Sequence, residues 1–254
     1  MILVVAGTQD GRVLAEALAA AGAPVLVSVA SAYGRQLADS RLYQVREGLL
    51  DAEGFRALFR SQGICGVIDA SHPYAAGVSA TLLAVCREAA IPYLRYERPA
   101  EPLPSYEKLR LADTAAAAAE LAVSLGKVIM LTTGSHTLAC YKAAADQAGV
   151  RLIARILPEP GVLAEALALG ILPKDIIAMQ GPFSVETNIA LINQFGADVV
   201  VTKNSGRIGG ADAKFQAAVQ TNSWLVVIDK PALAYGGAVG DIEPAVAWAK
   251  EVLL

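Results

Sequence analysis

The chain has 254 residues, of which 55% are hydrophobic and 18% charged, and its formal net charge is −3. This composition excludes a disordered chain, and the length is sufficient for two domains, each with its own core. The charge argues against a broad nucleic-acid-binding surface, and no apolar run is long enough to cross a bilayer. We therefore expect a cytoplasmic protein that binds neither nucleic acid nor membrane.

Cysteine and histidine usage predicts neither disulfides nor a metal site. The three cysteines, Cys65, Cys86 and Cys140, are far apart and set in apolar stretches. This is the pattern of small core residues in a reducing compartment. The chain contains only two histidines and no CxxC motif, so no metal is expected.

The first half of the chain alternates short apolar runs with segments of helical spacing. The apolar runs are β-rich and bounded by glycine or proline, and the segments between them place apolar residues on one helical face. We expect strands at residues 2–6, 25–30, 66–70 and 92–95, and helices at 12–21, 51–61 and 75–90.

A proline-rich connector separates the two halves. Pro99, Pro102 and Pro104 lie within six residues and make a stiff, extended segment. We place the domain boundary there, with an N-terminal lobe at residues 1–103 and a C-terminal lobe at 104–254. In the second lobe we expect a helix that Asp113 caps and that runs through Ser124, and another helix at 243–254. The expected strands are at 108–112, 128–131, 152–157, 176–179, 199–201 and 225–228.

This alternation predicts an α/β protein with two Rossmann-like lobes, mainly parallel sheets and an inter-lobe cleft. Near-continuous apolar strands are typical of parallel sheets that helices cover on both faces. Open parallel sheets bind ligands at the carboxyl ends of their strands. The residues directly after each expected strand are therefore the candidate site residues.

The loops after the first two strands favour a dinucleotide phosphate. Gly7 and Thr8 open a Gly-x-x-x-Gly turn that leads into a helix N-terminus, which attracts anions. A plain tight turn is the alternative. Ser31 and Arg35 follow the second strand, where an NAD site usually carries an acidic residue. A hydroxyl and an arginine instead favour NADPH, with NADH as the second choice, although Arg35 alone would also fit a solvated surface.

Polar residues gather after the next two strands. Asp69 lies at the end of the expected strand 66–70 and His72 follows it, where the imidazole suits proton donation or anion binding. A satisfied structural histidine is the alternative. Arg95 and Arg98 precede the connector and suit a bidentate clamp on substrate carboxylates. The alternative for these arginines is a structural ion pair with Glu97.

Two loops of the second half also favour anions. Thr133 and Gly134 follow a strand and open a helix. The glycine-rich loop at 202–210 carries Lys203 as a point charge or proton donor. Its other candidate ligands for phosphate or carboxylate are Ser205, Gly206 and Arg207, and a mobile surface loop is the alternative.

Taken in order, these clusters resemble the precorrin-6A reductase family. The resemblance is carried by Gly7-Thr8, by the run from Val27 to Gly34, by the run from Asp69 to Ala75, by Ile91 to Pro99, by Leu131 to Gly134, by Gly181-Pro182-Phe183 with Asn188, and by Val201 to Gly206. It spans nearly the whole chain, and the order and spacing of the motifs are more specific than any one of them.

The resemblance implies reduction of precorrin-6A, or of its cobalt form, to precorrin-6B in corrin (cobalamin) biosynthesis. A nicotinamide cofactor would supply the hydride, with NADPH or NADH used in different branches. The substrate would be a polycarboxylate tetrapyrrole held by the basic residues above, with Tyr74 among the side chains that pack on the ring. His72 and Lys203 are the candidate proton donors, and ordered water is a third source.

Three other functions fit parts of the pattern. A short-chain dehydrogenase needs Tyr-x-x-x-Lys, which this sequence lacks. A cofactor-free tetrapyrrole enzyme of the uroporphyrinogen-III synthase type also has two α/β lobes, but the phosphate-type turn at Gly7 argues against it. A non-enzymatic two-lobed ligand-binding module would bind without turnover. The protein is expected to be a monomer or a small homo-oligomer.

Overall fold

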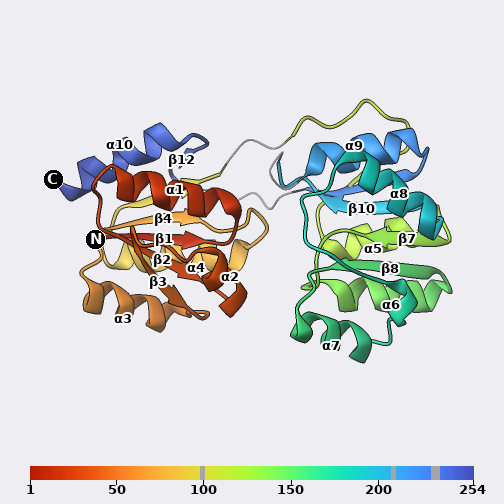
Figure 1. Ribbon diagram of the computed structural model, residues 1–254, viewed down its shortest axis with the longest axis horizontal. Coiled ribbons are helices and arrows are strands. Elements are labelled where there is room, and N and C mark those ends of the chain that lie inside the picture. Colours follow the sequence, from red (N-terminus) through yellow and green to blue (C-terminus); the bar gives the residue numbers. More distant parts are fainter. Residues whose placement is uncertain (98–100, 207–209, 230–234) are drawn as a thin grey trace. The chain divides into compact units, whose positions relative to one another are not determined.

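The computed structural model describes residues 1–97, 101–206, 210–229 and 235–254 (Figure 1). The chain divides into two compact units. Unit 1 comprises Met1–Pro99 together with Pro231–Leu254, and unit 2 comprises Ala100–Lys230. Both units are α/β, and in both the paired strands are parallel. The α/β fold with parallel sheets predicted from the sequence is confirmed.

Unit 1 is built on a six-stranded sheet with the order β12-β5-β4-β1-β2-β3 (Figure 1). Its strands are β1 (Ile2–Ala6), β2 (Val25–Val29), β3 (Gln44–Glu47), β4 (Gly66–Ala70), β5 (Tyr93–Tyr96) and β12 (Ala238–Val239). Its helices are α1 (Gln9–Ala20), α2 (Ala32–Leu37), α3 (Ala52–Gln62), α4 (Ala76–Glu88) and α10 (Ile242–Leu253).

Helices cover both faces of the unit 1 sheet, which explains why β1 is apolar along its whole length and why β2 and β4 are mainly apolar, with Ser28 and Asp69 as their polar residues. Alternate residues of β1 face opposite sides of the sheet. Ile2 and Val4 contribute to a core with α1 and α10, whereas Leu3 packs in a second core with α3 and α4. The sequence therefore needs apolar residues on both faces of β1.

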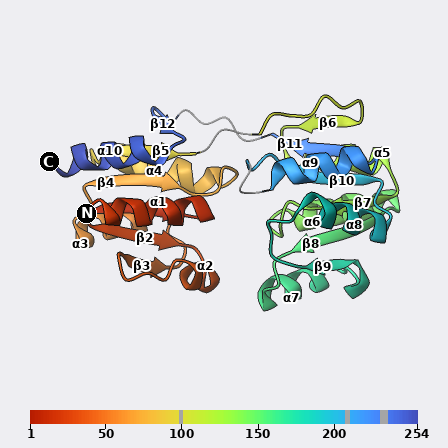
Figure 2. The same cartoon turned by 45° about the horizontal axis from the view of Figure 1, so that its top comes forward.

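Unit 2 is built on a second six-stranded sheet with the order β6-β11-β10-β7-β8-β9 (Figure 2). Its strands are β6 (Leu109–Ala112), β7 (Val128–Leu131), β8 (Arg151–Ile156), β9 (Ile176–Ala178), β10 (Val199–Lys203) and β11 (Trp224–Ile228). Its helices are α5 (Ala115–Leu125), α6 (Leu138–Ala148), α7 (Pro160–Ala168), the short 3-10 turn η1 (Pro173–Asp175), α8 (Val185–Phe195) and α9 (Ala211–Gln220).

The C-terminal segment differs from the prediction that residues 104–254 form one lobe. Residues 231–254 belong to unit 1. Ala238 of β12 pairs with Arg95 of β5, and Ala245 and Ala249 of α10 are fully buried in the unit 1 core. The chain therefore returns to its first unit because the apolar face of α10 completes that core.

Local capping also differs from the prediction at one helix. Thr114, rather than Asp113, caps α5, and its hydroxyl accepts a hydrogen bond from the Ala117 N–H at 3.1 Å. Within the part of the chain that the structure describes, no helix is long and apolar enough to span a membrane.

Each sheet has one point at which the strand order reverses, and ligands of open parallel sheets bind outside the carboxyl ends of the strands at that point. In unit 1 the reversal lies between β1 and β4. In unit 2 it lies between β7 and β10. We call the loops after β1 and β4 the first edge, and the loops after β7 and β10 the second edge.

The packing of α10 yields a prediction about the stability of unit 1. A Cβ placed on Gly66 of β4 would lie 3.2 Å from the Trp248 ring, so the indole packs directly on the strand backbone. We expect Trp248→Ala to lower the free energy of unfolding by about 2 kcal/mol, because it leaves a cavity over β4. Urea denaturation measures this change. Leu254→Ala, at a fully exposed position, is the control, and equal effects of both variants would contradict the assignment of α10 to this core.

Candidate active site

The turn after β1 is shaped for close approach of a ligand to its backbone. A Cβ on Gly7 would lie 3.0 Å from the backbone nitrogen of His72, so no larger residue fits without moving the loop after β4. Gly11 is buried, and a Cβ there would lie 3.0 Å from the Ala6 Cβ, which lets α1 pack tightly on β1. The Thr8 hydroxyl caps α1 by accepting from the Gly11 N–H at 3.4 Å. Gly7 itself is exposed, as a phosphate-binding turn requires.

Cationic side chains lie at the carboxyl ends of β2 and β3. Ser31 caps the short helix α2 by accepting from the Gly34 N–H at 3.1 Å, and Arg35 is exposed. Arg46 of β3 donates to the Ser28 hydroxyl at 2.9 Å. Partial burial lowers the pKa of its guanidinium. Arg46 is a residue that the sequence analysis missed.

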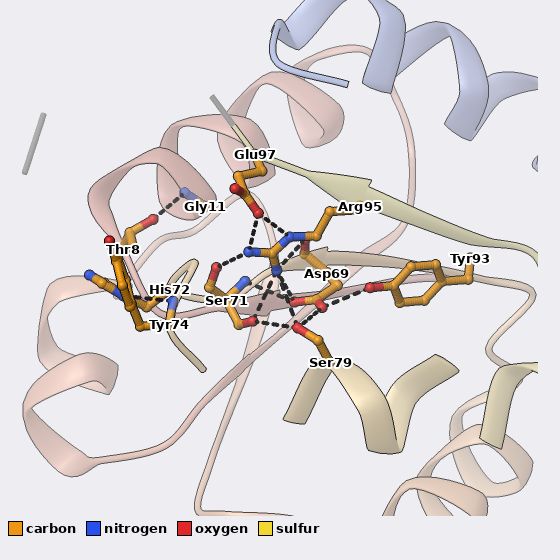
Figure 3. Close-up of polar contacts among 10 residues, drawn as sticks. All are labelled: Thr8, Gly11, Asp69, Ser71, His72, Tyr74, Ser79, Tyr93, Arg95 and Glu97. Carbon is orange, nitrogen blue, oxygen red and sulfur yellow. Dashed lines mark hydrogen bonds and ion pairs between the residues drawn. The ribbon is translucent and has the colours of Figure 1, made fainter. Parts of the chain in front are cut away.

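Asp69 is the centre of a buried polar network at the first edge (Figure 3). Its carboxylate accepts from the Tyr93 hydroxyl at 2.8 Å, from the Ser79 hydroxyl at 2.6 Å and from the Ser71 N–H at 3.0 Å. It also forms an ion pair of 2.9 Å with Arg95, and both side chains are fully buried. Asp69 therefore holds the first edge together from inside.

Arg95 lies in this network rather than on a surface, which differs from its predicted role as a substrate clamp. Its guanidinium pairs with Glu97 at 2.9 Å as well as with Asp69, and it is 0% exposed. Burial alone would lower the pKa of Arg95, but the two carboxylates outweigh it and raise the pKa. The structural ion pair with Glu97, the alternative considered for this residue, is what the structure contains. Arg98, the other predicted clamp residue, lies outside the described residues.

His72 and Tyr74 lie together on the loop after β4, and both are half-buried (Figure 3). Their ring centroids are 5.6 Å apart, and the Tyr74 N–H donates to His72 Nδ1 at 3.3 Å. In the neutral imidazole this bond places the ring proton on Nε2. The loop therefore orients a potential proton donor beside the Gly7 turn.

The second edge contains hydroxyl groups that have no partner. Lys203, at the end of β10, donates from Nζ to the Thr133 carbonyl at 3.0 Å and so joins the two strands of the reversal point. The hydroxyls of Thr133, Thr137 and Tyr141 are buried without a hydrogen-bond partner in the described part of the chain. Buried polar groups are rarely left unpaired, so their presence here indicates a site for a polar ligand. Gly134 stands between them at φ +83°.

Buried cations accompany these hydroxyls. Arg155 of β8 donates to Asn188 Oδ1 at 2.8 Å, and its guanidinium lies 4.5 Å from the centre of the Phe183 ring. Lys214 of α9 is buried, and its Cε lies 3.9 Å from the position of a Cβ on Gly210. Among residues with described coordinates, no carboxylate lies within ion-pair distance of Arg155 or Lys214. This region can therefore neutralise an anionic ligand.

Burial weakens the proton affinity of all three cations near the second edge. It lowers the pKa of Arg155 to about 10 and lowers the pKa of Lys203 as well. For Lys214, burial lowers the pKa to about 7, and the charge of Arg155 acts in the same direction. Asp212 partly offsets these effects, and Lys203 adds to them. A small change of pH near neutrality therefore changes the fraction of Lys214 that is protonated.

The backbone carbonyl of Lys203 stabilises the start of the loop after β10. The Ser205 N–H donates to the Lys203 carbonyl at 3.0 Å, and Gly206 adopts a φ of +74°. Next to them, Asn204 exchanges two hydrogen bonds with the Glu101 backbone, at 3.0 and 2.7 Å. The predicted residue Arg207 lies outside the described residues.

The predicted residues fall into two groups, one on each unit. The first edge brings together Gly7, Thr8, Asp69, His72 and Tyr74, with Arg95 beneath them, whereas Ser31 and Arg35 follow β2. The second edge brings together Thr133, Gly134, Lys203, Ser205 and Gly206.

Sequence reasoning missed Arg155 and Lys214, although both carried a signal. Arg155 interrupts an otherwise apolar strand, and Lys214 lies on the helix face of the buried residues Ala211 and Ala218. A cation on a buried face usually has a functional role, because burying its charge costs free energy. Both residues were therefore recognisable as candidates for an anion site.

Comparisons with known proteins agree with this geometry. A family model described as "Precorrin-6x reductase CbiJ/CobK" matches residues 1–250. Curated relatives include the cobalt-precorrin-6A reductase of Priestia megaterium, which is 36% identical over 247 residues, 97% of this chain and 96% of the relative. The cobalt-precorrin-6A reductase of Salmonella typhimurium is 40% identical over 232 residues, 91% and 87% of the two chains. The precorrin-6A reductase of Rhodococcus erythropolis is 33% identical over 252 residues, 97% and 96% of the two chains.

A solved structure shares the fold. The CobK precorrin-6A reductase superposes with a TM-score of 0.81 at 24% identity, and the match covers 99% of this chain and 96% of that one. At this identity the likeness supports the fold alone.

Two Rossmann-like units, each with ligand-type residues at its reversal point, define a nucleotide-dependent α/β enzyme. The chain belongs to the precorrin-6x reductase family, a family of oxidoreductases that use a nicotinamide cofactor. The resemblance seen in the sequence is thereby confirmed. The synthase-type, dehydrogenase and non-enzymatic alternatives are not favoured.

The network around Asp69 yields a second stability prediction. Asp69→Asn keeps the shape of the side chain but removes the charge that pairs with Arg95, and breaking a buried pair costs about 3 kcal/mol of unfolding free energy. Urea denaturation measures the loss. Glu53→Gln removes an exposed pair with Arg60 and is expected to cost less than about 1 kcal/mol. A loss at Asp69 no larger than at Glu53 would show that the network does not stabilise the unit.

Proposed function

We propose that the protein reduces precorrin-6A, or its cobalt-bound form, to the dihydro product with NADPH. Membership of the reductase family over residues 1–250 carries this proposal. The geometry supports different binding roles for the two edges. The first edge would bind the cofactor, and the second edge would bind the carboxylates of the tetrapyrrole.

The first edge fits a dinucleotide. Gly7 is exposed and has no room for a side chain, so a pyrophosphate can approach the backbone at the N-terminus of α1. Thr8 lies in the same turn and adds a hydroxyl. Beside it, Asp69 holds the loop of His72 against Gly7. When bound, the cofactor supplies the hydride, and the chain has to place it and exclude competing reactions.

The residues after β2 favour NADPH over NADH. Residues 30–35 contain no aspartate or glutamate to hold the ribose hydroxyls of NADH. Ser31 and Arg35 instead offer a hydroxyl and a cation, and Arg46 brings a second cation at the end of the neighbouring strand β3. Two arginines suit the additional phosphate of NADPH.

The second edge fits a polycarboxylate. Arg155 and Lys214 provide positive charge with no carboxylate of the described residues at ion-pair distance, and Lys203 adds its charge nearby. The partnerless hydroxyls of Thr133 and Thr137 can donate hydrogen bonds to acid side chains of the ring. Ser205, Gly206 and Arg207, on the loop after β10, are proposed to contact the same acid groups, and Arg98 remains a proposed clamp residue. Tyr74 is proposed to pack on the macrocycle.

Reduction needs one hydride and one proton. The chain offers two proton donors, and both are held in place by backbone hydrogen bonds. Accepting a bond at Nδ1 places the proton of the neutral His72 imidazole on Nε2, and we propose that this proton is the one transferred. Burial eases proton loss from Lys203 by lowering its pKa. We propose these two groups as the candidate donors.

A direct assay tests the reductase proposal. The purified protein is incubated with precorrin-6A or cobalt-precorrin-6A, each with NADPH or NADH, and loss of reduced cofactor is followed optically. We expect turnover with one of the tetrapyrroles and a preference for NADPH. The absence of cofactor consumption in all four combinations would overturn the proposal.

Arginine variants test the choice of cofactor. We expect Arg35→Ala with Arg46→Ala to weaken NADPH binding by about tenfold or more and to leave NADH binding nearly unchanged, because only NADPH carries the extra phosphate. Fluorescence titration of each nucleotide measures both constants. Arg60→Ala, on α3, is the control for loss of a surface cation. Equal losses for NADPH and NADH would contradict this assignment.

The titration of Lys214 predicts a pH dependence of substrate binding. Because its pKa is lowered to about 7, Lys214 is cationic below that pH and neutral above it. We therefore expect affinity for the tetrapyrrole acid to be highest below about pH 7 and to fall by up to about tenfold per unit above it. Binding titrations across this range measure the effect. Lys214→Arg keeps the charge and is expected to flatten the profile, so identical profiles would refute the role of Lys214.

A further inference from the structure

We propose that Arg95 and Tyr235 are positioning residues that set the geometry of the first edge from beneath, so that the returning C-terminal segment helps to form the cofactor site. The proposal rests on the assignment of the cofactor to that edge. Arg95 and Tyr235 would touch neither cofactor nor substrate, and would act through Ser71 and His72.

On one side, the Arg95 guanidinium fixes the loop after β4 (Figure 3). It donates to the Ser71 carbonyl at 3.1 Å and to the Ser71 hydroxyl at 3.1 Å. The loop in turn abuts the cofactor turn, since a Cβ on Gly7 would lie 3.5 Å from Ser71 Cα and 3.0 Å from the His72 nitrogen. A small displacement of Ser71 would therefore close or distort the Gly7 turn.

On the other side, residues that follow the return of the chain from unit 2 cover Arg95. The Tyr235 ring centre lies 5.2 Å from the guanidinium carbon, and the Arg95 N–H donates to the Gly237 carbonyl at 3.2 Å. The neighbouring Glu97 N–H donates to the Val239 carbonyl at 2.9 Å, and the Glu97 carboxylate holds Arg95 Nε at 3.0 Å. One side chain thus connects the C-terminal segment to the cofactor loop.

These contacts require the guanidinium of an arginine rather than the ammonium of a lysine. Its planar fork has five donors, which here serve the two carboxylates and the Ser71 carbonyl and hydroxyl at the same time. The aromatic face of Tyr235 favours the cation and screens it from water. A lysine has the charge but cannot reach Ser71 and Glu97 together.

Variants of Tyr235 test the proposal without removing a buried charge. We expect Tyr235→Leu to raise the Kd for NADPH by about tenfold, because the guanidinium loses its aromatic cover and Ser71 shifts. Tyr235→Phe keeps the ring and is expected to restore most of the affinity. NADPH fluorescence measures binding without substrate, and thermal unfolding is recorded for each variant. An octacarboxylate porphyrin, as a probe of the second edge, is expected to bind all three proteins alike.

Arg95→Lys provides an independent measurement. We expect it to weaken NADPH binding more than porphyrin binding, whereas general loss of structure would weaken both together. If the unaltered protein bound no NADPH, the cofactor assignment would fail. If the unaltered protein bound NADPH and the Tyr235→Leu and Arg95→Lys variants matched it, the positioning role would be overturned and the cofactor assignment would stand.

Discussion

The first edge depends on one buried cation. Arg95 has 0% exposure, and a guanidinium can occupy such a place only if carboxylates and hydrogen-bond acceptors compensate its lost hydration. Asp69 and Glu97 supply the charge, and Ser71 supplies the acceptors. The compensation is complete enough to raise the pKa of Arg95 despite burial. Because Asp69 lies on β4 and Ser71 on the loop after it, satisfying this one side chain also fixes the loop beside Gly7.

The buried cations of unit 2 lack the compensation that Arg95 has in unit 1. Arg155 and Lys214 are buried without a carboxylate at ion-pair distance among the described residues, and burial lowers the pKa of both. Folding alone gains little from such cations, since an unpaired buried charge is costly. Their cost is offset when an anion binds. The same reasoning applies to the hydroxyls of Thr133 and Thr137, which are buried with no hydrogen-bond partner among the described residues.

Much of the fold could be predicted because parallel strands buried on both faces are mainly apolar, as at residues 66–70 and 128–131, where prediction and structure agree. The edge strand β3 was missed because its sequence, Gln44 to Glu47, is polar and short. The return of α10 to unit 1 was missed because its pattern shows an apolar face but not which core that face enters. At the site, loop residues such as Gly7 and Lys203 were found from their place after strands. The burial of Arg95 depends on contacts with Asp69 and Tyr235, which are distant in sequence and which no local pattern records.

The two units thus share one topology rule and differ in the electrostatics of their buried cations, and this difference supports the roles proposed for the two edges. A dinucleotide bound at a helix N-terminus is held largely by backbone groups, so the first edge needs an accurately placed backbone more than it needs net charge. The compensated network around Arg95 provides that placement. A tetrapyrrole acid presents several carboxylates, so the second edge needs uncompensated positive charge, which Arg155 and Lys214 provide. A carboxylate at ion-pair distance from Lys214 of α9 would make unit 2 more stable when empty but, under the proposed function, would weaken the binding of such a substrate.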